Sequence, residues 1–145
     1  MDRSLAIPVT AAAGGLIALQ APINGTLGRS TGSLAAALIS FAIGTIALAL
    51  IVVLAGQGGG LGGVTEVAPV YLVGGLLGAV YVTCALIAVG SIGAGGVAAG
   101  TITGQLAASV LIDRLGILGL EQVPLSASRV AGVVLLLAGT FLIVR

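Results

Sequence analysis

The chain has 145 residues, of which 59% are hydrophobic and 6% charged, and its formal net charge is +1. Soluble domains carry about 25% charged residues, so this chain could not cover itself with a polar surface in water, and its composition predicts a membrane protein. The sequence has no basic patch, which argues against a nucleic-acid partner. With one cysteine and no histidine, it excludes an intramolecular disulfide and a Cys/His zinc site.

Five apolar stretches are long enough to cross a bilayer, since about twenty residues of helix reach 30 Å. The first stretch follows Arg3 and is too long for a cleavable signal peptide, so it is predicted to stay in the protein as a helix. The sequence thus predicts one all-α membrane domain over residues 1–145. Its spans are expected at about residues 5–23, 33–55, 68–89, 93–112 and 125–144.

Three connectors between the spans are interpreted from their composition. Residues 24–32 are rich in turn-forming types and predict a turn after the first span. Residues 56–63 are mostly glycine and predict a flexible linker that holds no helix. The pair Gly90 and Ser91 predicts a very short turn, which would make the third and fourth spans an antiparallel hairpin.

The arginines near the span ends are divided almost evenly between the two sides of the membrane. Five spans place Arg3, Arg114 and Arg129 on one side, and Arg29 and Arg145 on the other. The positive-inside rule therefore gives almost no orientation bias. The chain could insert both ways and pair head to tail, or insert one way and pair with an oppositely inserted partner. The third alternative is a single topology that is set by the first span or by the insertion machinery.

The fourth span carries two rows of residues along one helix. The first row repeats GxxxG in tandem, a pattern that lets membrane helices pack closely, and consists of Gly96, Gly100 and Gly104. The second row is turned by about 100° and offers hydrogen bonds from Thr101, Gln105 and Ser109. We predict that the second row lines a transport pathway. For Gln105 the alternative is a structural hydrogen bond to a neighbouring helix.

Polar side chains in the first three spans are further candidates for the pathway. Gln20 and Asn24 lie four residues apart on one helix face. They are predicted to face a central cavity, but Asn24 could instead cap the first helix and Gln20 could hold a neighbouring helix. Ser40 lies in a small-residue stripe, where helix packing is the alternative to substrate contact. Tyr81 lies deep in the third span and needs a partner or a cavity for its hydroxyl group.

The third span also repeats small residues at helical spacing. The row runs at alternating steps of three and four residues through Tyr71, Gly74, Gly78, Tyr81 and Ala85. This spacing is typical of a seam along which helices pack. We therefore assign Gly74 and Gly78, together with the glycine row of the fourth span, to helix packing or dimerisation.

No span contains a charged residue at its middle. Asp113 closes the fourth span and is interpreted as interfacial charge, or as half of a gate. In an antiparallel dimer it would face Arg29 of the other chain, and the ion pair would form on one face and open on the other. An intramembrane acid is a usual functional group, and its absence favours a neutral, zwitterionic or anionic metabolite over a lipophilic dication.

Several motifs appear in a fixed order along the chain. They are Gln20-Ala-Pro-Ile-Asn24-Gly25, Ser40-Phe-x-x-Gly44-Thr45, Gly74-Gly75-x-x-Gly78-Ala-x-Tyr81 and Gly104-Gln105-Leu-x-Ala-Ser109-x-x-Ile-Asp113. In this order the sequence resembles the YdcZ-like family of the drug/metabolite transporter superfamily, over essentially its whole length. The resemblance implies a five-helix exporter of the bacterial inner membrane.

The resemblance also implies how such a chain would work. Larger superfamily members look like two five-helix units fused in inverted orientation, so a half-size chain would act as a dimer with itself or with a homologous sister chain. The related small multidrug exporters depend on a glutamate inside the first helix. The first span here has no acid beyond Asp2, so the resemblance does not extend to that coupling mechanism.

Two classes of function follow. In the first, the chain is a secondary transporter that moves a small metabolite or drug-like compound by alternating access, with its site at the interface between inverted repeats. In the second, it is a membrane subunit that does not transport, and its glycines serve assembly only. No nucleophile–base pair or metal-ligand cluster indicates an enzyme or a cofactor. The expected partners are the small-molecule substrate, the lipid bilayer and a second subunit.

Overall fold

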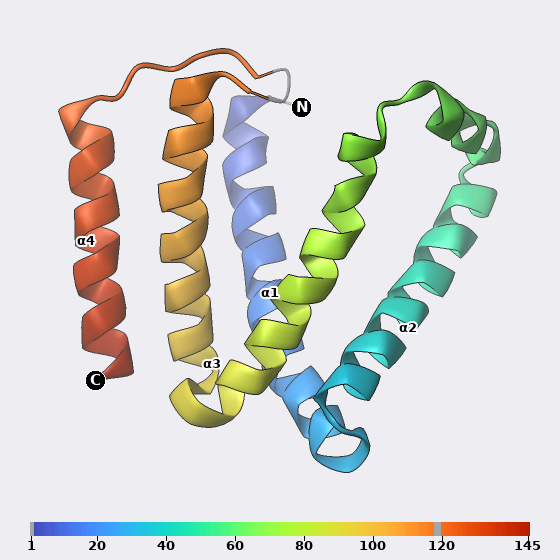
Figure 1. Ribbon diagram of the computed structural model, residues 1–145, viewed down its shortest axis with the longest axis horizontal. Coiled ribbons are helices and arrows are strands. Elements are labelled where there is room, and N and C mark those ends of the chain that lie inside the picture. The colour runs from blue at the N-terminus through green and yellow to red at the C-terminus, as the bar shows by residue number, and fades with distance from the viewer. Residues whose placement is uncertain (1, 118–119) are drawn as a thin grey trace. The chain divides into compact units, whose positions relative to one another are not determined.

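The computed structural model describes residues 2–117 and 120–145, and every regular element in these residues is helical. The α-helices are α1 (Arg3–Thr31), α2 (Ser33–Leu54), α3 (Gly74–Leu115) and α4 (Ala127–Val144), and the short 3-10 helices are η1 (Gly58–Glu66) and η2 (Pro69–Val73) (Figure 1). The predicted all-α class is thus confirmed. The chain forms two compact units: the central unit (Gln20–Gly90) and the terminal unit (Met1–Leu19 with Ser91–Arg145).

The helices are long and apolar enough to cross a membrane. Four segments qualify: Ser4–Thr31, Ser33–Leu54, Pro69–Leu115 and Ala127–Val144. The third has 47 residues, which would measure about 70 Å as one straight helix, more than twice the hydrocarbon thickness. This segment therefore has the length of two spans, and the four segments accommodate the five that the sequence predicts.

A single backbone break at Gly93 divides α3. Its dihedral angles are φ 69° and ψ 172°, within an otherwise helical run. This region of backbone space is almost restricted to glycine. The two parts, residues 74–92 and 94–115, measure about 29 and 33 Å, so each has the length of one span. The turn predicted at Gly90 and Ser91 is wrong, because both residues are helical and the break follows three residues later.

The predicted turn after the first span is also wrong. Helix α1 continues through Asn24 and Gly25 and ends at Thr31. Gly32, with φ 84°, then separates α1 from α2. Glycine inside a helix costs up to about 1 kcal/mol, but most helix stability in proteins comes from tertiary packing. Here the last turns of α1 contact α3 of the same unit, and that contact stabilises the helix where local propensity predicts a turn.

The glycine-rich linker is ordered as a short helix rather than as a flexible loop. Gly56, with φ 67°, ends α2, and η1 begins two residues later. The backbone N–H of Gly60 donates to the carbonyl oxygen of Gln57 at 3.1 Å, a bond between residues three apart that is typical of a 3-10 helix. The third span therefore begins with η2, and its α-helical part starts at Gly74 rather than near Ala68.

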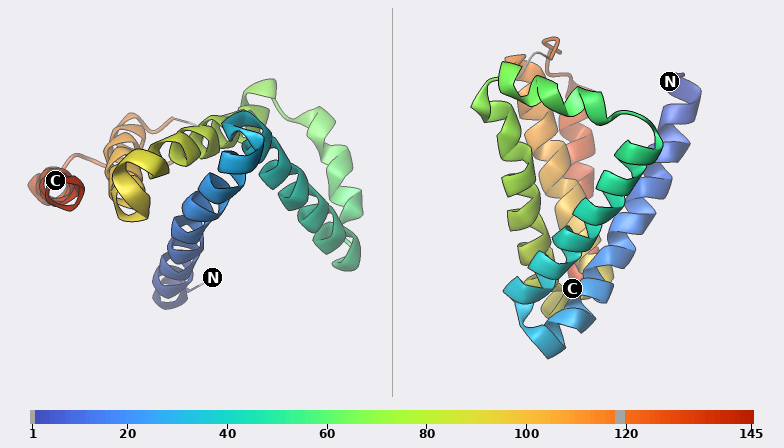
Figure 2. Two further views of the ribbon diagram at one scale, coloured as in Figure 1. Left: turned by 90° about the horizontal axis from the view of Figure 1, so that it is seen from below. Right: turned by 90° about the vertical axis from the view of Figure 1, so that its right-hand side faces the viewer.

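The buried residues of the two units are few and small. In the central unit the buried apolar residues are Ala21, Ala36, Ala37, Val82, Ala85 and Leu86. In the terminal unit, α4 lies beside the second part of α3 (Figures 1 and 2). Helix α4 itself, Ala127–Val144, has no fully buried residue. Large apolar side chains cover the outside of all four α-helices, which is the surface expected of a protein in a lipid bilayer.

Candidate functional site

A close helix contact in the central unit lies between the last turns of α1 and the first part of α3. An ideal Cβ atom placed on Gly25 would lie 2.7 Å from Cγ1 of Val89. One placed on Gly28 would lie 3.1 Å from Cδ2 of Leu86. Real Cβ atoms do not approach other atoms as closely as the first distance. Glycine at position 25 is therefore required for the two helices to pack as they do.

Asn24 lies beside this contact and is the most deeply buried of the predicted pathway residues. Only 5% of its surface is exposed. Its side-chain Nδ2 atom is buried and has no hydrogen-bond partner among the described residues. The alternative role as a helix cap is wrong, because α1 continues beyond it to Thr31. An unpaired buried donor costs about 1–3 kcal/mol, so the Nδ2 group adds no hydrogen bond that would stabilise the helix contact.

The other predicted pathway residues of the central unit lie on all three of its long helices. Gln20 is on α1, Ser40 on α2 and Tyr81 on the first part of α3, and all three are half-buried. The side chains of Ser40 and Tyr81 form no hydrogen bond with the described residues, so both polar groups are free to contact a ligand or a partner. Gly78 faces Phe41 on α2, with 3.5 Å from an ideal Cβ to Cζ.

The glycine row of the fourth span is only partly used by contacts within the described residues. Gly96 is buried, and an ideal Cβ there would lie 2.9 Å from Cβ of Ile92. Gly74, Gly100 and Gly104 have no atom within 4 Å of an ideal Cβ in the described part of the chain. These three positions therefore leave room for another helix, and their role in packing or dimerisation stays a prediction.

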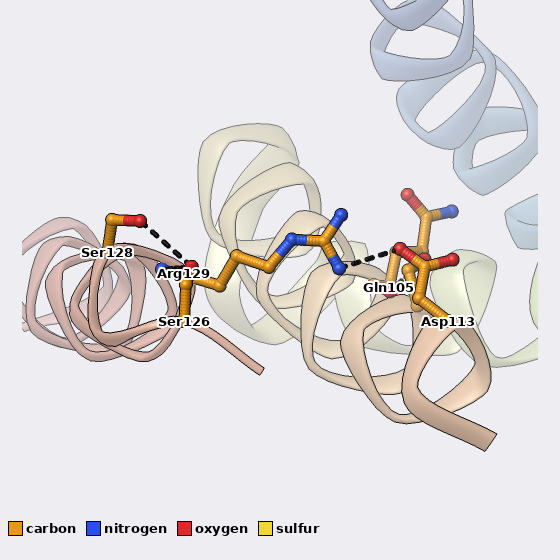
Figure 3. A network of polar contacts seen from close by, with 6 residues as sticks. Gln105, Asp113, Ser126, Ser128 and Arg129 are labelled. Carbon is orange, nitrogen blue, oxygen red and sulfur yellow. Dashed lines mark hydrogen bonds and ion pairs between the residues drawn. The ribbon is translucent and has the colours of Figure 1, made fainter. Parts of the chain in front are cut away.

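The polar row of the fourth span is largely exposed. Thr101 is half-buried, whereas Gln105 and Ser109 are exposed. The hydroxyl of Ser109 donates to the carbonyl oxygen of Gln105 at 2.7 Å. The side-chain amide of Gln105 forms no hydrogen bond with the described residues, and Figure 3 shows it on the same helix as Asp113. A primary amide in an apolar span needs partners, so this row is available to a substrate or to a second subunit.

Two threonines that the sequence does not predict to meet form a contact that joins α3 to α4. The hydroxyl oxygens of Thr103 and Thr140 lie 2.6 Å apart. Each hydroxyl also reaches the carbonyl oxygen of Ala99, at 2.9 Å from Thr103 and 3.1 Å from Thr140. Thr103 is 6% exposed. Lone threonines in an apolar helix usually bond their own backbone, so the sequence carries no signal that these two residues meet.

The Thr103–Thr140 contact is predicted to stabilise the terminal unit modestly. Replacing either residue with valine removes one hydroxyl at nearly constant volume. Interhelical hydrogen bonds in membranes contribute on average about 0.6 kcal/mol and at most about 1.7 kcal/mol. A double-mutant cycle on reversible unfolding should therefore give a coupling energy in this range. Thr10→Val is the matched control, because Thr10 bonds only carbonyl oxygens of its own helix. A coupling energy of zero would contradict the prediction.

An ion pair closes the loop between α3 and α4. Nη1 of Arg129 lies 3.0 Å from Oδ2 of Asp113, and the two side chains are 34% and 32% exposed. Figure 3 shows the arginine reaching across from α4, where its backbone N–H donates to Oγ of Ser126 at 3.3 Å. The loop is also held by Gln122, whose Nε2 donates to the carbonyl oxygen of Arg114 at 2.8 Å. Asp113 thus has a partner within its own chain.

Arg29, the other half of the predicted gate, has a different environment. It lies in the last turn of α1, and its Nη2 donates to Oγ1 of Thr26 at 2.9 Å. A pair between Asp113 and Arg29 of a second chain would have to compete with Arg129. The gate therefore stays a prediction.

Replacing Arg129 tests whether Asp113 pairs with Arg129 of its own chain or with Arg29 of a second chain. The intrachain pair is predicted to contribute about 0.2–1 kcal/mol, because both groups are partly exposed. Arg129→Gln and Asp113→Asn should therefore show a small coupling energy for unfolding that decreases as salt increases. Arg29→Gln is the control and should show no coupling with Asp113→Asn in the isolated chain. Coupling between positions 29 and 113 that requires the dimer would instead favour the gate.

Comparison with known proteins places the chain in one family. Among the described residues, no group of three or more acidic or cysteine side chains could hold a metal ion. No curated protein matches the chain, and neither does any solved structure. A family model does match, over nearly the full length of the sequence. Residues 5–142 match the family described as "Putative inner membrane exporter, YdcZ", and the chain belongs to this family.

Proposed function

We propose that the chain is a secondary transporter that exports a small metabolite or drug-like compound across the bacterial inner membrane. It works by alternating access, and two chains make one functional unit: two copies, or one copy with a homologous, oppositely inserted subunit. Each chain contributes five spans to an inverted-repeat arrangement of ten. The residues proposed to contact the substrate are Gln20, Asn24, Ser40 and Tyr81 in the central unit and, separately, the polar row of α3 in the terminal unit.

The observation that carries this proposal is the exposed polar row of α3. Gln105 and Ser109 are exposed on a helix that is long and apolar enough to cross a membrane. Next to them, Gly100 and Gly104 leave open space. An amide is costly on a helix face that meets lipid, whereas it can bond a substrate or a partner on a face that meets a pathway or a second subunit. This combination of amide and open glycines supports a site that is completed by a second chain.

Export can be tested by an untargeted comparison of what cells release. Cells that express the wild-type chain, Gln105→Ala or no chain are grown in parallel, and small molecules in the medium are compared by mass spectrometry. We expect at least one compound to accumulate with the wild type and to fall at least tenfold with Gln105→Ala. Gly14→Ala is the matched control, because an ideal Cβ at Gly14 meets no described atom within 4 Å. Equal profiles for wild type and empty cells would overturn the proposal.

The topology of the chain tests the arrangement of the two subunits. A single cysteine is placed after Arg145 in a Cys84→Ala background and is labelled with an impermeant thiol reagent from each side of the membrane. Labelling from both sides in comparable amounts supports an antiparallel homodimer. Labelling from one side supports pairing with an oppositely inserted sister chain, and co-purification of that chain would identify it. One-sided labelling without such a partner would contradict the dimer proposal.

The second candidate function is a subunit that assembles but does not transport. The open positions Gly100 and Gly104 favour it as well, because they provide a packing surface. The two functions differ in their response to substitution. In the assembly function Gly100→Leu disrupts the complex and Gln105→Ala has no further effect. In the transport function Gln105→Ala abolishes export while the dimer persists.

A further inference from the structure

We propose that the side-chain amide of Asn24 is a hydrogen-bond donor to the transported molecule, and that this molecule is a small carboxylate. This inference rests on the proposed transport function and names its substrate class. It starts from the Nδ2 atom of Asn24, which is buried without a partner among the described residues. Such a group is costly in the absence of ligand, and a ligand that supplies an acceptor removes the cost.

The buried amide of Asn24 differs from an ordinary structural amide because its donor forms no hydrogen bond with the described residues. A structural amide in a membrane helix bonds its neighbours and adds stability. The Nδ2 atom of Asn24 forms no such bond among the described residues, although only 5% of the residue is exposed. Gln20 lies one turn earlier on the same face of α1 and is half-buried. The two amides therefore form a short polar strip, and the buried one has an unused donor.

The charges of the central unit favour an anionic ligand. Within Gln20–Gly90 the charged residues are Arg29 and Glu66. Arg29 lies five residues after Asn24, about 7.5 Å along α1. Glu66 lies in η1, which follows the far end of α2 (Figure 1). The end of the unit that contains Asn24 thus carries positive charge only, which attracts an anion and repels a cation. A carboxylate supplies both the acceptor and the negative charge.

The buried amide of Asn24 lies next to the contact between α1 and α3. Gly25 and Gly28 bring α1 against Val89 and Leu86, and Asn24 lies next to the tighter of these contacts. Because only 5% of Asn24 is exposed, a ligand can reach Nδ2 only if the packing around this residue opens. Alternating access requires a conformational change of this kind. The conformation with α1 packed on α3 is therefore the one in which the carboxylate site is closed.

The test uses the purified full-length chain and soluble probes of known chemistry. The apparent melting temperature is measured with sodium acetate, lactate and succinate. Tetraethylammonium chloride is the matched cation, sodium chloride controls for ionic strength, and phosphatidylglycerol vesicles are the lipid source of anionic oxygen. We expect at least one carboxylate to raise the melting temperature of the wild type, and the cation and the lipid to have no such effect.

Substitutions at Asn24 separate ligand binding from packing. Asn24→Leu removes the unpaired donor, so without ligand its melting temperature should equal or exceed that of the wild type. Its carboxylate affinity should fall at least tenfold. Asn24→Asp replaces the donor with a like charge and should also lose the carboxylate response. Gln57→Leu is the control at an exposed amide outside the α-helices, and should keep the response. Size-exclusion profiles verify that each variant folds.

Several results would overturn the inference. The first two are a wild-type melting temperature that no carboxylate raises, or that only phosphatidylglycerol raises. The third is a rise with carboxylate that persists in Asn24→Leu. The fourth is a rise with the cation that is kept or strengthened in Asn24→Asp. A strong loss of stability in Asn24→Leu without ligand would indicate a structural amide instead. Export distinguishes the two levels of the proposal. If export persists in Asn24→Leu, the carboxylate site is refuted but the transport function is not. If the wild type exports nothing, the transport function itself is refuted.

Discussion

Replacing Gly93 with alanine is expected to lower the stability of the protein and the yield of correctly inserted chains. The φ of 69° and ψ of 172° at this position are available to glycine but cost other residues about 1–3 kcal/mol. The alternative for the variant is to continue the helix through position 93. A continuous α3 of 42 residues would measure about 63 Å, twice the thickness of the hydrocarbon core. The first outcome lowers stability, and the second removes the break that divides α3 into two spans.

The control for Gly93→Ala lies three residues earlier. Gly90 is helical, and an ideal Cβ there meets no described atom within 4 Å. Because alanine favours a helix over glycine by up to about 1 kcal/mol, Gly90→Ala should leave the melting temperature unchanged or raise it. Both variants are compared by melting temperature, by the monodisperse fraction after extraction and by labelling of a cysteine after Arg145. Equal results for the two alanine variants would show that the break at Gly93 does not shape the fold.

The spans are predictable from the sequence because the membrane imposes a simple requirement on length and polarity. An uncharged stretch of about twenty residues has few alternatives to a spanning helix. The breaks between spans are harder to place, because the chain contains 25 glycines and each permits a break without requiring one. Gly25 lies inside a helix, whereas Gly32 and Gly93 have positive φ angles. Only packing, which joins residues far apart in sequence, distinguishes these cases.

The candidate site shows the same limit. An amide in an apolar span is visible in the sequence, so the sequence predicts both Asn24 and Gln105 as pathway residues. It does not show that one is buried and the other exposed, because that depends on the neighbouring helices. The sequence also suggests Arg29 as the partner of Asp113 but not Arg129, which forms the ion pair. In the sequence, the first turn of α4 indicates only the end of a span. Its proximity to α3 depends on the conformation of the loop that joins the two helices.

Replacing Gly25 with alanine is expected to separate α1 from α3 in the central unit. The added methyl group would lie 2.7 Å from Cγ1 of Val89. Valine is branched at Cβ and has little rotamer freedom in a helix, so the side chain cannot move aside and the helices must part. Overpacking of this kind costs about 1–3 kcal/mol. The melting temperature should fall, and a carboxylate probe should bind with altered affinity because the contact next to Asn24 is open.

The partner substitution makes this prediction specific to one contact. Val89→Ala removes the atom that clashes, so the double variant Gly25→Ala/Val89→Ala should be more stable than the sum of the single effects predicts. Gly28→Ala is an internal comparison with a smaller expected effect, because its new Cβ would meet the flexible end of Leu86 at 3.1 Å. Gly14→Ala, with open space around it, should cost nothing. Additive effects at positions 25 and 89 would mean that the helices are not in contact there, and the closed site at Asn24 would lose its physical basis.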